Sequence, residues 1–207
     1  MNLLENDRIL SIMKERILVT GGTGYIGSHT VVELQNSGYD VVIVDNLSNS
    51  SADVVDNIEK VSGIRPAFEK LDCLDFEGMD KLFTKYPGIK GIIHFAASKA
   101  VGESVQKPLL YYRNNLVSLI NLLELMPKHG VEGIIFSSSC TVYGQPDVLP
   151  VTEEAPIKKA ESPYGNTKQI NEEIIRDTVA SGSPINAIML RYFNPIGAHP
   201  TALIGLK

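Results

Sequence analysis

The 207-residue sequence is poor in cysteine, with only Cys73 and Cys140. Two cysteines cannot build a disulfide scaffold, and without a C-x-x-C pair or a histidine cluster we expect no metal site. No apolar run approaches the roughly 20 residues that cross a bilayer. The first twelve residues lack the apolar core of a signal peptide. We therefore expect a cytoplasmic protein that neither spans nor binds a membrane.

The sequence also lacks an excess of positive charge. Nineteen Lys and Arg residues stand against 24 Asp and Glu residues, and the formal net charge is −5. No basic cluster offsets this balance, so a nucleic-acid partner is not expected. The length and the 43% hydrophobic content are sufficient for one well-packed α/β domain and the beginning of another.

A glycine-rich stretch, Arg16–Gly27, is the most informative part of the chain. The apolar run Ile17–Val19 is typical of a strand buried on both faces. Gly21, Gly24 and Gly27 follow at three-residue spacing, and a helical pattern then runs to Gly38. Such a turn lets the backbone approach a pyrophosphate, whose charge is favoured by the helix N-terminus. An ordinary tight β–α turn is the alternative that the motif alone leaves open.

An acidic residue follows the next expected strand, at residues 40–44. Asp45 stands eighteen residues after Gly27, where a carboxylate can accept hydrogen bonds from a ribose hydroxyl. Residues 46–59 contain no Arg or Lys to hold a 2′-phosphate, which favours NAD over NADP. The simpler alternative is that Asp45 is a turn residue or a helix cap.

Strand and helix patterns alternate along the rest of the chain. This alternation predicts an α/β fold with a doubly wound parallel sheet, Rossmann-like, whose ligand lies beyond the carboxyl ends of the strands. Because Met13 stands where a natural start would lie, residues 1–12 are interpreted as an extension outside the fold. The further strands are expected at 66–71, 91–95, 133–136 and 186–190, and the further helices at 54–61, 75–86, 108–128 and 163–181.

The stretch Ser162–Lys168 places a tyrosine and a lysine on one face of a helix. Tyr164 and Lys168 are at positions i and i+4 after the expected cap Ser162. A nearby ammonium favours the phenolate, so we expect Lys168 to lower the pKa of Tyr164 and to make it a general base. Ser139 is expected to hydrogen-bond the same hydroxyl. An incidental Tyr–Lys pair on an amphipathic helix is the alternative.

Later in the same helix, Ile170, Ile174 and Ile175 are expected to face inward. The polar Glu172, Glu173 and Arg176 are expected to face solvent.

Several longer stretches resemble the extended short-chain dehydrogenase/reductases, and in particular the branch formed by the UDP-glucose 4-epimerase family. The resemblance extends from Met13 almost to the C-terminus. It is strongest in Val19–Thr30, Asp45–Ser50, Lys99–Pro108, Ser137–Gly144, Ser162–Lys168 and Leu190–Pro200.

This resemblance implies an NAD-dependent isomerase that inverts C4 of a UDP-hexose, from UDP-galactose to UDP-glucose, through a transient 4-keto intermediate. Tyr164 would be the catalytic base, Lys168 its partner and Ser139 its hydroxyl companion. The implied contacts with the cofactor NAD are Gly21, Gly24, Tyr25, Ile26, Gly27, Asp45, Asn46, Asn49, Ser50, Asp72, Cys73, Phe95, Ala96, Ala97, Lys99, Asn114, Tyr164 and Lys168. The implied substrate contacts are Lys99, Ser139, Thr141, Tyr164, Tyr192, Phe193 and Asn194.

Members of this family continue well beyond the length of this chain. The resemblance therefore implies an NAD-binding domain at residues 13–190, and the start of a truncated substrate-binding region at residues 191–207. Whether 207 residues suffice for activity is left open, as is the choice between UDP-glucose and its N-acetyl analogue. The apolar helix expected at 108–128 fits either a homodimer interface or burial within its own chain.

Two other functions compete with epimerisation. A sugar-nucleotide 4,6-dehydratase needs an acid and a base beside the serines of the fifth strand, but Cys140 and Thr141 stand there. A non-catalytic NAD-binding module is the other alternative, and the presence of Ser139, Tyr164 and Lys168 argues against it.

Overall fold

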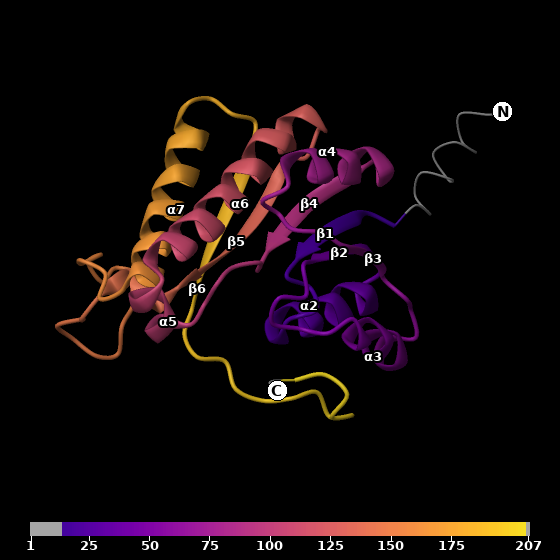
Figure 1. Cartoon of the computed structure of the whole chain (residues 1–207), viewed down its shortest axis with the longest axis horizontal. Helices are drawn as coiled ribbons and strands as arrows, with labels where there is room; N and C mark the ends of the chain where they lie inside the picture. Colours follow the sequence, from indigo (N-terminus) through magenta and orange to yellow (C-terminus); the bar gives the residue numbers. More distant parts are fainter. Residues whose placement is uncertain (1–13, 206–207) are drawn as a thin grey trace.

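The computed structural model describes residues 14–205, and the extension expected at residues 1–12 lies outside that part. The chain forms a six-stranded parallel sheet in the order β3-β2-β1-β4-β5-β6, with helices on both faces (Figure 1). The expected doubly wound α/β class is confirmed. The strands are β1 (Arg16–Thr20), β2 (Asp40–Asp45), β3 (Ala67–Lys70), β4 (Ile89–His94), β5 (Gly133–Ser139) and β6 (Asn186–Tyr192).

Two apolar clusters hold the helices to the sheet. Leu18 and Val19 are neighbours in β1 and both are fully buried, because they point to opposite faces and join different clusters. One cluster packs α4 (Phe76–Lys85), α6 (Pro108–Lys128) and α7 (Pro163–Ala180) on the face of Leu18. The other packs α2 (Tyr25–Asn36) and α3 (Asp53–Ser62) on the face of Val19.

Two short elements have no counterpart in the sequence-based expectations. Helix α5 (Val101–Gln106) lies between β4 and α6, and the 3₁₀ helix η1 (Cys140–Tyr143) follows β5. Each is shorter than two α-helical turns, so neither shows a full hydrophobic period. Strand β5 is also longer than expected, because its ladder with β6 continues through the serines to Ser139.

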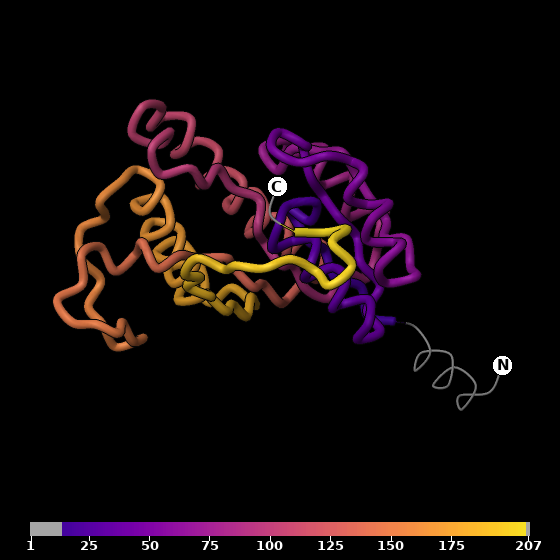
Figure 2. The backbone as a smooth tube through the Cα atoms, turned by 90° about the horizontal axis from the view of Figure 1, so that it is seen from below, coloured from indigo at the N-terminus to yellow at the C-terminus, as the bar shows by residue number. Residues whose placement is uncertain are grey.

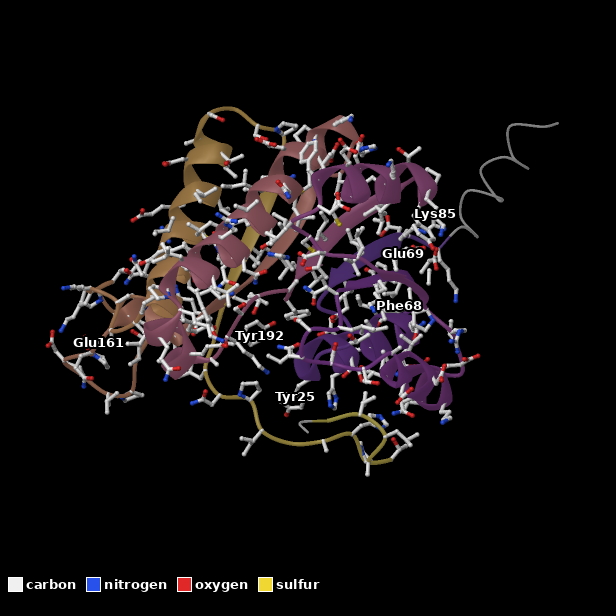
Figure 3. All side chains as sticks on the ribbon, viewed as in Figure 1. Tyr25, Phe68, Glu69, Lys85, Glu161 and Tyr192 are labelled. Carbon is white, nitrogen blue, oxygen red and sulfur yellow. The ribbon has the colours of Figure 1, made fainter. Side chains whose placement is uncertain are left out.

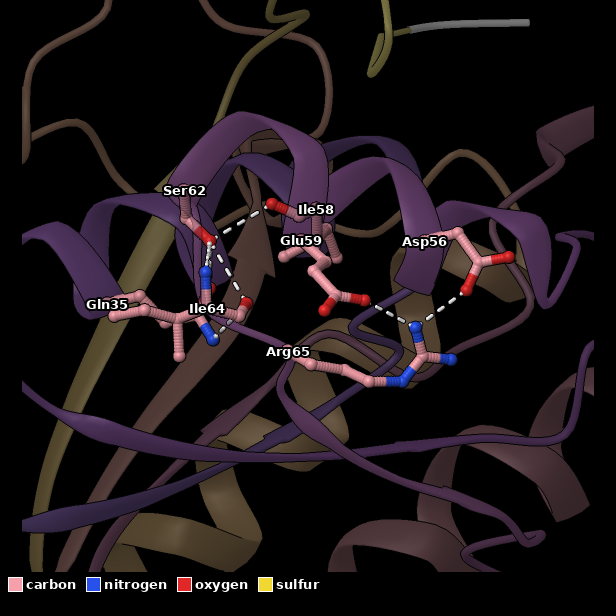
Figure 4. Close-up of polar contacts among 7 residues, drawn as sticks. All are labelled: Gln35, Asp56, Ile58, Glu59, Ser62, Ile64 and Arg65. Carbon is pink, nitrogen blue, oxygen red and sulfur yellow. Dashed lines mark hydrogen bonds and ion pairs between the residues drawn. The ribbon is translucent and has the colours of Figure 1, made fainter.

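Polar contacts fix the end of helix α3 against helix α2 (Figure 4). The Ser62 hydroxyl donates to the Gln35 side-chain oxygen at 2.8 Å, and the Gln35 amide donates to the Ile64 carbonyl at 3.1 Å. Arg65 pairs with Asp56 at 2.8 Å and with Glu59 at 2.6 Å. These contacts anchor the far end of the segment that begins in the β2–α3 loop, where several predicted cofactor residues lie.

The segment after β6 crosses back under helix α2 (Figure 2). Ile204 is 4% exposed and belongs to the same apolar cluster as Val31 and Val32 of α2. Within residues 14–205, no helix combines the length and the apolar character that crossing a bilayer would require. No group of three or more His, Cys, Asp or Glu side chains in that range is arranged to hold a metal ion.

Candidate functional site

The turn between β1 and α2 requires glycine at two positions. Gly21 has φ +69°, and a Cβ there would lie 2.7 Å from the backbone nitrogen of Ala96. A Cβ on Gly27 would overlap the carbonyl oxygen of Gly21. Gly24 is the N-cap of α2, and no side chain of the described residues caps this helix. The first N–H groups of α2 are therefore available to an anion, as the sequence predicts.

Asp45 organises this turn from the end of β2. The side chain is 7% exposed, and its Oδ2 accepts from the Thr23 N–H at 3.2 Å. Its Oδ1 accepts from the Leu47 N–H at 2.9 Å and from the Ser50 hydroxyl at 3.1 Å. A carboxylate offers about four acceptor positions, so these three bonds leave capacity for one more donor.

The ends of β2 and β3 are joined by a second polar pair. Asn46 Nδ2 donates to Asp72 Oδ2 at 3.0 Å, while Asp72 Oδ1 accepts from the Leu74 N–H at 2.9 Å. The side chain of Cys73 packs in the apolar core, where burial raises the pKa of its thiol to about 12. Any contact of Cys73 with a ligand would therefore use its backbone.

The loop after β4 passes close to the glycine turn and is held by an asparagine that the sequence reading missed. Asn115 is 1% exposed; its Oδ1 accepts from the Ser98 N–H at 2.8 Å, and its Nδ2 donates to the Ser98 carbonyl at 3.0 Å. The predicted Asn114 donates to the Ser98 hydroxyl and to Asn115 Oδ1, both at 3.1 Å. Both are polar residues in an apolar helix, so no local pattern distinguishes them. Lys99 follows in the same loop and is exposed.

Helix α7 brings Tyr164 and Lys168 to the end of β5. Ser162 caps the helix by accepting from the Gly165 N–H at 3.1 Å. Lys168 is 3% exposed; its Nζ donates to the Ser137 carbonyl at 2.6 Å and lies 5.8 Å from the centroid of the Tyr164 ring. Ser139 lies two residues further along β5 and interacts with the Tyr164 hydroxyl. The predicted grouping of Tyr164, Lys168 and Ser139 is therefore present in the structure.

The pKa of Tyr164 is raised in this structure, so the expectation that it is lowered is wrong. Burial raises the pKa of Tyr164 because a phenolate would lose hydration, and the Ser139 hydroxyl opposes this shift by hydrogen bonding. Lys168 does not offset the burial, since its ammonium donates to a carbonyl and lies over the ring rather than at the hydroxyl. Burial also lowers the pKa of Lys168 to about 8.

Two of the predicted substrate residues, Tyr192 and Thr141, are neighbours of Ser139. Tyr192 pairs with Ser139 across the β5–β6 ladder, and its ring lies 6.3 Å from the ring of Phe95. Figure 3 shows Tyr192 and Tyr25 on the side of the molecule where the C-terminal segment passes. The hydroxyl of Thr141 is buried and has no hydrogen-bond partner within residues 14–205. Phe193 and Asn194 are exposed just beyond β6.

Glu172 departs from its expected place. It was expected on the solvent face of α7 with Glu173 and Arg176, but it is 1% exposed while Glu173 and Arg176 are exposed. Its carboxylate pairs with Arg191 of β6, a residue that the sequence reading did not consider. Helical periodicity could not show this, because the partner lies on a strand that is distant in sequence.

Comparison with known proteins shows which family this chain belongs to. A sequence model described as "NAD dependent epimerase/dehydratase family" matches residues 17–205. UDP-glucose 4-epimerase of Dictyostelium discoideum is 51% identical over 191 residues, which is 92% of this chain and 55% of that protein. The human UDP-glucose 4-epimerase is 49% identical over 199 residues, covering 93% of this chain and 57% of that protein.

Solved structures of UDP-glucose 4-epimerases are also similar to this chain. The crystal structure of UDP-glucose 4-epimerase from Bifidobacterium longum in complex with NAD+ and UDP is 47% identical, with a TM-score of 0.90. The alignment with that structure covers 92% of this chain and 57% of the Bifidobacterium longum chain. The epimerase from Stenotrophomonas maltophila, with bound NAD and formylated UDP-arabinopyranose, also has a TM-score of 0.90 at 47% identity, covering 93% of this chain and 57% of that one. The chain thus spans about half the length of the curated relatives it matches.

Proposed function

Because this chain belongs to the NAD dependent epimerase/dehydratase family, we propose that it carries the cofactor site and the proton-transfer groups of an epimerase. The reaction is inversion of C4 in a UDP-hexose, between UDP-galactose and UDP-glucose. The observation that carries the proposal is the convergence of the Gly21–Gly27 turn with Tyr164, Lys168 and Ser139 at the carboxyl edge of the sheet. The similarity to UDP-glucose 4-epimerases over most of the chain supports the choice of substrate.

The residues of the glycine turn fit a dinucleotide. A Cβ at Gly21 or Gly27 would meet backbone atoms, so the turn keeps a close-packed backbone surface beside the free N–H groups of α2. In the proposal Asp45 accepts from the adenosine ribose, and its negative charge disfavours a 2′-phosphate there. The remaining cofactor contacts are proposed to be Gly24, Tyr25, Ile26, Asn46, Asn49, Ser50, Asp72, Cys73, Phe95, Ala96, Ala97, Lys99 and Asn114.

Tyr164 is proposed to move the proton of the sugar C4 hydroxyl. Bound NAD supplies the acceptor that takes hydride from C4 and later returns it to the opposite face. In the proposal Ser139 orients the Tyr164 hydroxyl by hydrogen bonding, while the ammonium of Lys168 lies 5.8 Å from the centroid of the Tyr164 ring. Burial disfavours the phenolate of Tyr164 and the hydrogen bond from Ser139 opposes this only in part, so in the proposal the positive nicotinamide ring of bound NAD would favour the phenolate further.

The sugar nucleotide is proposed to contact Lys99, Thr141, Tyr192, Phe193 and Asn194. The unpartnered buried hydroxyl of Thr141 supports this, because a buried polar group is normally hydrogen-bonded. In this proposal residues 13–190 form the NAD-binding unit, and residues 191–207 begin the region that meets the substrate.

A homodimer through helix α6 is also part of the proposal. One side of α6 is buried in the core, whereas Leu109, Val117 and Ile120 on the other side are 81%, 37% and 36% exposed. An apolar stripe along a long helix is a surface that a second copy of the chain can cover.

The test is to incubate the protein with NAD and UDP-galactose and to identify the products by NMR. We expect UDP-glucose from the wild type, and a rate at least about 100-fold lower from Tyr164→Phe, which removes only the hydroxyl. NAD affinity, measured by calorimetry, should be the same in both proteins. Retention of the rate by Tyr164→Phe would remove Tyr164 from the mechanism, and NAD binding without turnover by the wild type would favour a non-catalytic module.

A further inference from the structure

The side chain of Glu172 is the centre of a buried charge cluster that the proposed reaction does not use. Its Oε1 accepts from the Ser138 hydroxyl at 2.6 Å and from Arg191 Nε at 2.9 Å. Its Oε2 accepts from Arg191 Nη2 at 2.8 Å and from Arg176 Nη2 at 2.6 Å. The carboxylate is 1% exposed, so it is held by four donors out of contact with water.

This carboxylate joins three elements that each carry a group of the proposed site. Glu172 lies one helical turn after Lys168 on α7. Ser138 stands on β5 between Ser137, whose carbonyl accepts from Lys168, and Ser139. Arg191 immediately precedes Tyr192 on β6, and its guanidinium lies 4.7 Å from the Tyr143 ring centroid.

The cluster is stable only as a complete unit. Burial alone would raise the pKa of Glu172, but the hydrogen bonds from Arg191 and Ser138 outweigh this and bring the pKa below its usual value. Removing the carboxylate would leave the guanidinium of Arg191 and the hydroxyl of Ser138 without their acceptor. A half-buried charge that has lost its partner is drawn towards water, so the ends of β5 and β6 would shift relative to α7.

We propose that Glu172 is a positioning residue, which holds the ends of β5 and β6 against α7 so that Ser139, Tyr164 and Lys168 keep their mutual geometry. It acts through Ser138 and Arg191 and is not itself a catalytic residue. The proposal rests on the proposed function only in taking these three groups as the reacting ones. Displacements of about 1 Å at a reacting group can lower a rate about 100-fold, which makes such a residue detectable.

The first experiment compares Glu172→Gln with the control Glu173→Gln, which changes the adjacent, exposed residue of the same helix. We expect Glu172→Gln to lower kcat for UDP-galactose about 10- to 100-fold, with KM and NAD affinity changed less than about threefold. Glu173→Gln should behave like the wild type, and Glu172→Asp should recover part of the rate. Equal kcat values for Glu172→Gln and the wild type would overturn the proposal.

The second experiment does not depend on turnover. The pKa of Lys168 is read from its ¹³Cε NMR signal, assigned by comparison with Lys168→Arg. If Glu172 positions Lys168, Glu172→Gln lets water reach the ammonium and the pKa rises from about 8 towards 10.5. Mere loss of a negative charge would move this pKa downwards, so a fall or an unchanged value contradicts positioning.

The two experiments separate the proposals. A wild type that does not epimerise, but whose Lys168 pKa rises in Glu172→Gln, would refute the proposed function and retain the positioning role. An active wild type whose rate and Lys168 pKa are insensitive to Glu172→Gln would support the proposed function and refute the positioning role of Glu172.

Ser138→Ala serves if Glu172→Gln does not fold. It removes only the link to β5 and keeps the two-point ion pair between Glu172 and Arg191. We expect folding to persist and kcat to fall about tenfold. A fully active Ser138→Ala would overturn the proposal in that case.

Discussion

At the scale of single residues, the site depends on side chains that do two tasks at once. Asp45, the proposed ribose acceptor, also accepts from the Thr23 and Leu47 N–H groups and so shapes the glycine turn. Lys168 is placed beside Tyr164, yet its ammonium donates to the Ser137 carbonyl. A substitution at either position therefore changes the shape of the site as well as its chemistry.

Asp45→Asn is expected to weaken NAD binding by about 10- to 100-fold, because a hydrogen bond to a charged acceptor contributes roughly 1.5–3 kcal/mol. Affinity for NADP should fall less, since the charge that repels a 2′-phosphate is also lost. Calorimetric titration with both cofactors measures these affinities. The control is Asp177→Asn, which changes an exposed residue near the C-terminal end of α7. Unchanged NAD affinity would show that Asp45 is not the ribose acceptor.

At the scale of elements, helix α7 contributes more than any other to the site. It carries Tyr164 in its first turn, Lys168 in its second and Glu172 in its third. Its start is fixed by Ser162, whose hydroxyl accepts from the Gly165 N–H, and by Pro163 in the first turn. Because Tyr164 lies in that first turn, the cap determines how firmly the proposed base is held.

Ser162→Ala should lower the free energy of unfolding by about 1 kcal/mol, because the first turn of α7 loses its cap. It should also reduce turnover of UDP-galactose, since the frayed turn contains Tyr164. The matched control is Asp75→Ala, which removes the cap of α4, where Asp75 accepts from the Gly78 N–H at 3.0 Å. Urea unfolding should show a similar loss for both variants, and an equal loss of turnover in both would contradict the special role of the α7 cap.

At the scale of the whole molecule, the sheet order sets where the parts of the site meet. Strands β1 and β4 are neighbours although β2 and β3 intervene in sequence, so the glycine turn lies beside the loop after β4. His94 ends β4 in the interior; it is 2% exposed and its Nδ1 lies 2.6 Å from the Thr20 hydroxyl. Burial, with a smaller contribution from the charge of Lys168, lowers the pKa of His94 to about 3.

This buried histidine predicts that acid destabilises the fold. Between pH 6.5 and pH 3 the unfolded chain binds a proton at His94 that the folded chain does not, so stability falls as the pH falls through this range. The amide of His94→Asn can still bond Thr20. This variant should reduce the slope of unfolding free energy against pH by up to the amount that one bound proton contributes. Urea titrations between pH 4.5 and pH 7 measure this, with His199→Asn as the control. An unchanged slope in His94→Asn would mean that His94 does not remain neutral in the fold.

The sequence by itself determined the order of the elements, the glycine turn and the Tyr164–Lys168 pair, because these depend on local periodicity and on spacing along one segment. Strand and helix patterns of full length were readable, whereas the short α5 and η1 were not. Asp45 and the serines of β5 were also found, since residues at the carboxyl ends of parallel strands meet whatever their side chains are.

The tertiary structure alone decided which neighbours those segments meet. Helical spacing placed Glu172 with the polar residues of α7, but the packing of β5 and β6 turned it inward to Ser138 and Arg191. The tertiary structure also set Asn115, which the sequence analysis did not single out, against the backbone of the loop after β4, and burial raised the pKa of Tyr164, opposite to the expected direction. The physical reason is the same in each case: burial and pairing depend on atoms distant in sequence, which no local pattern encodes.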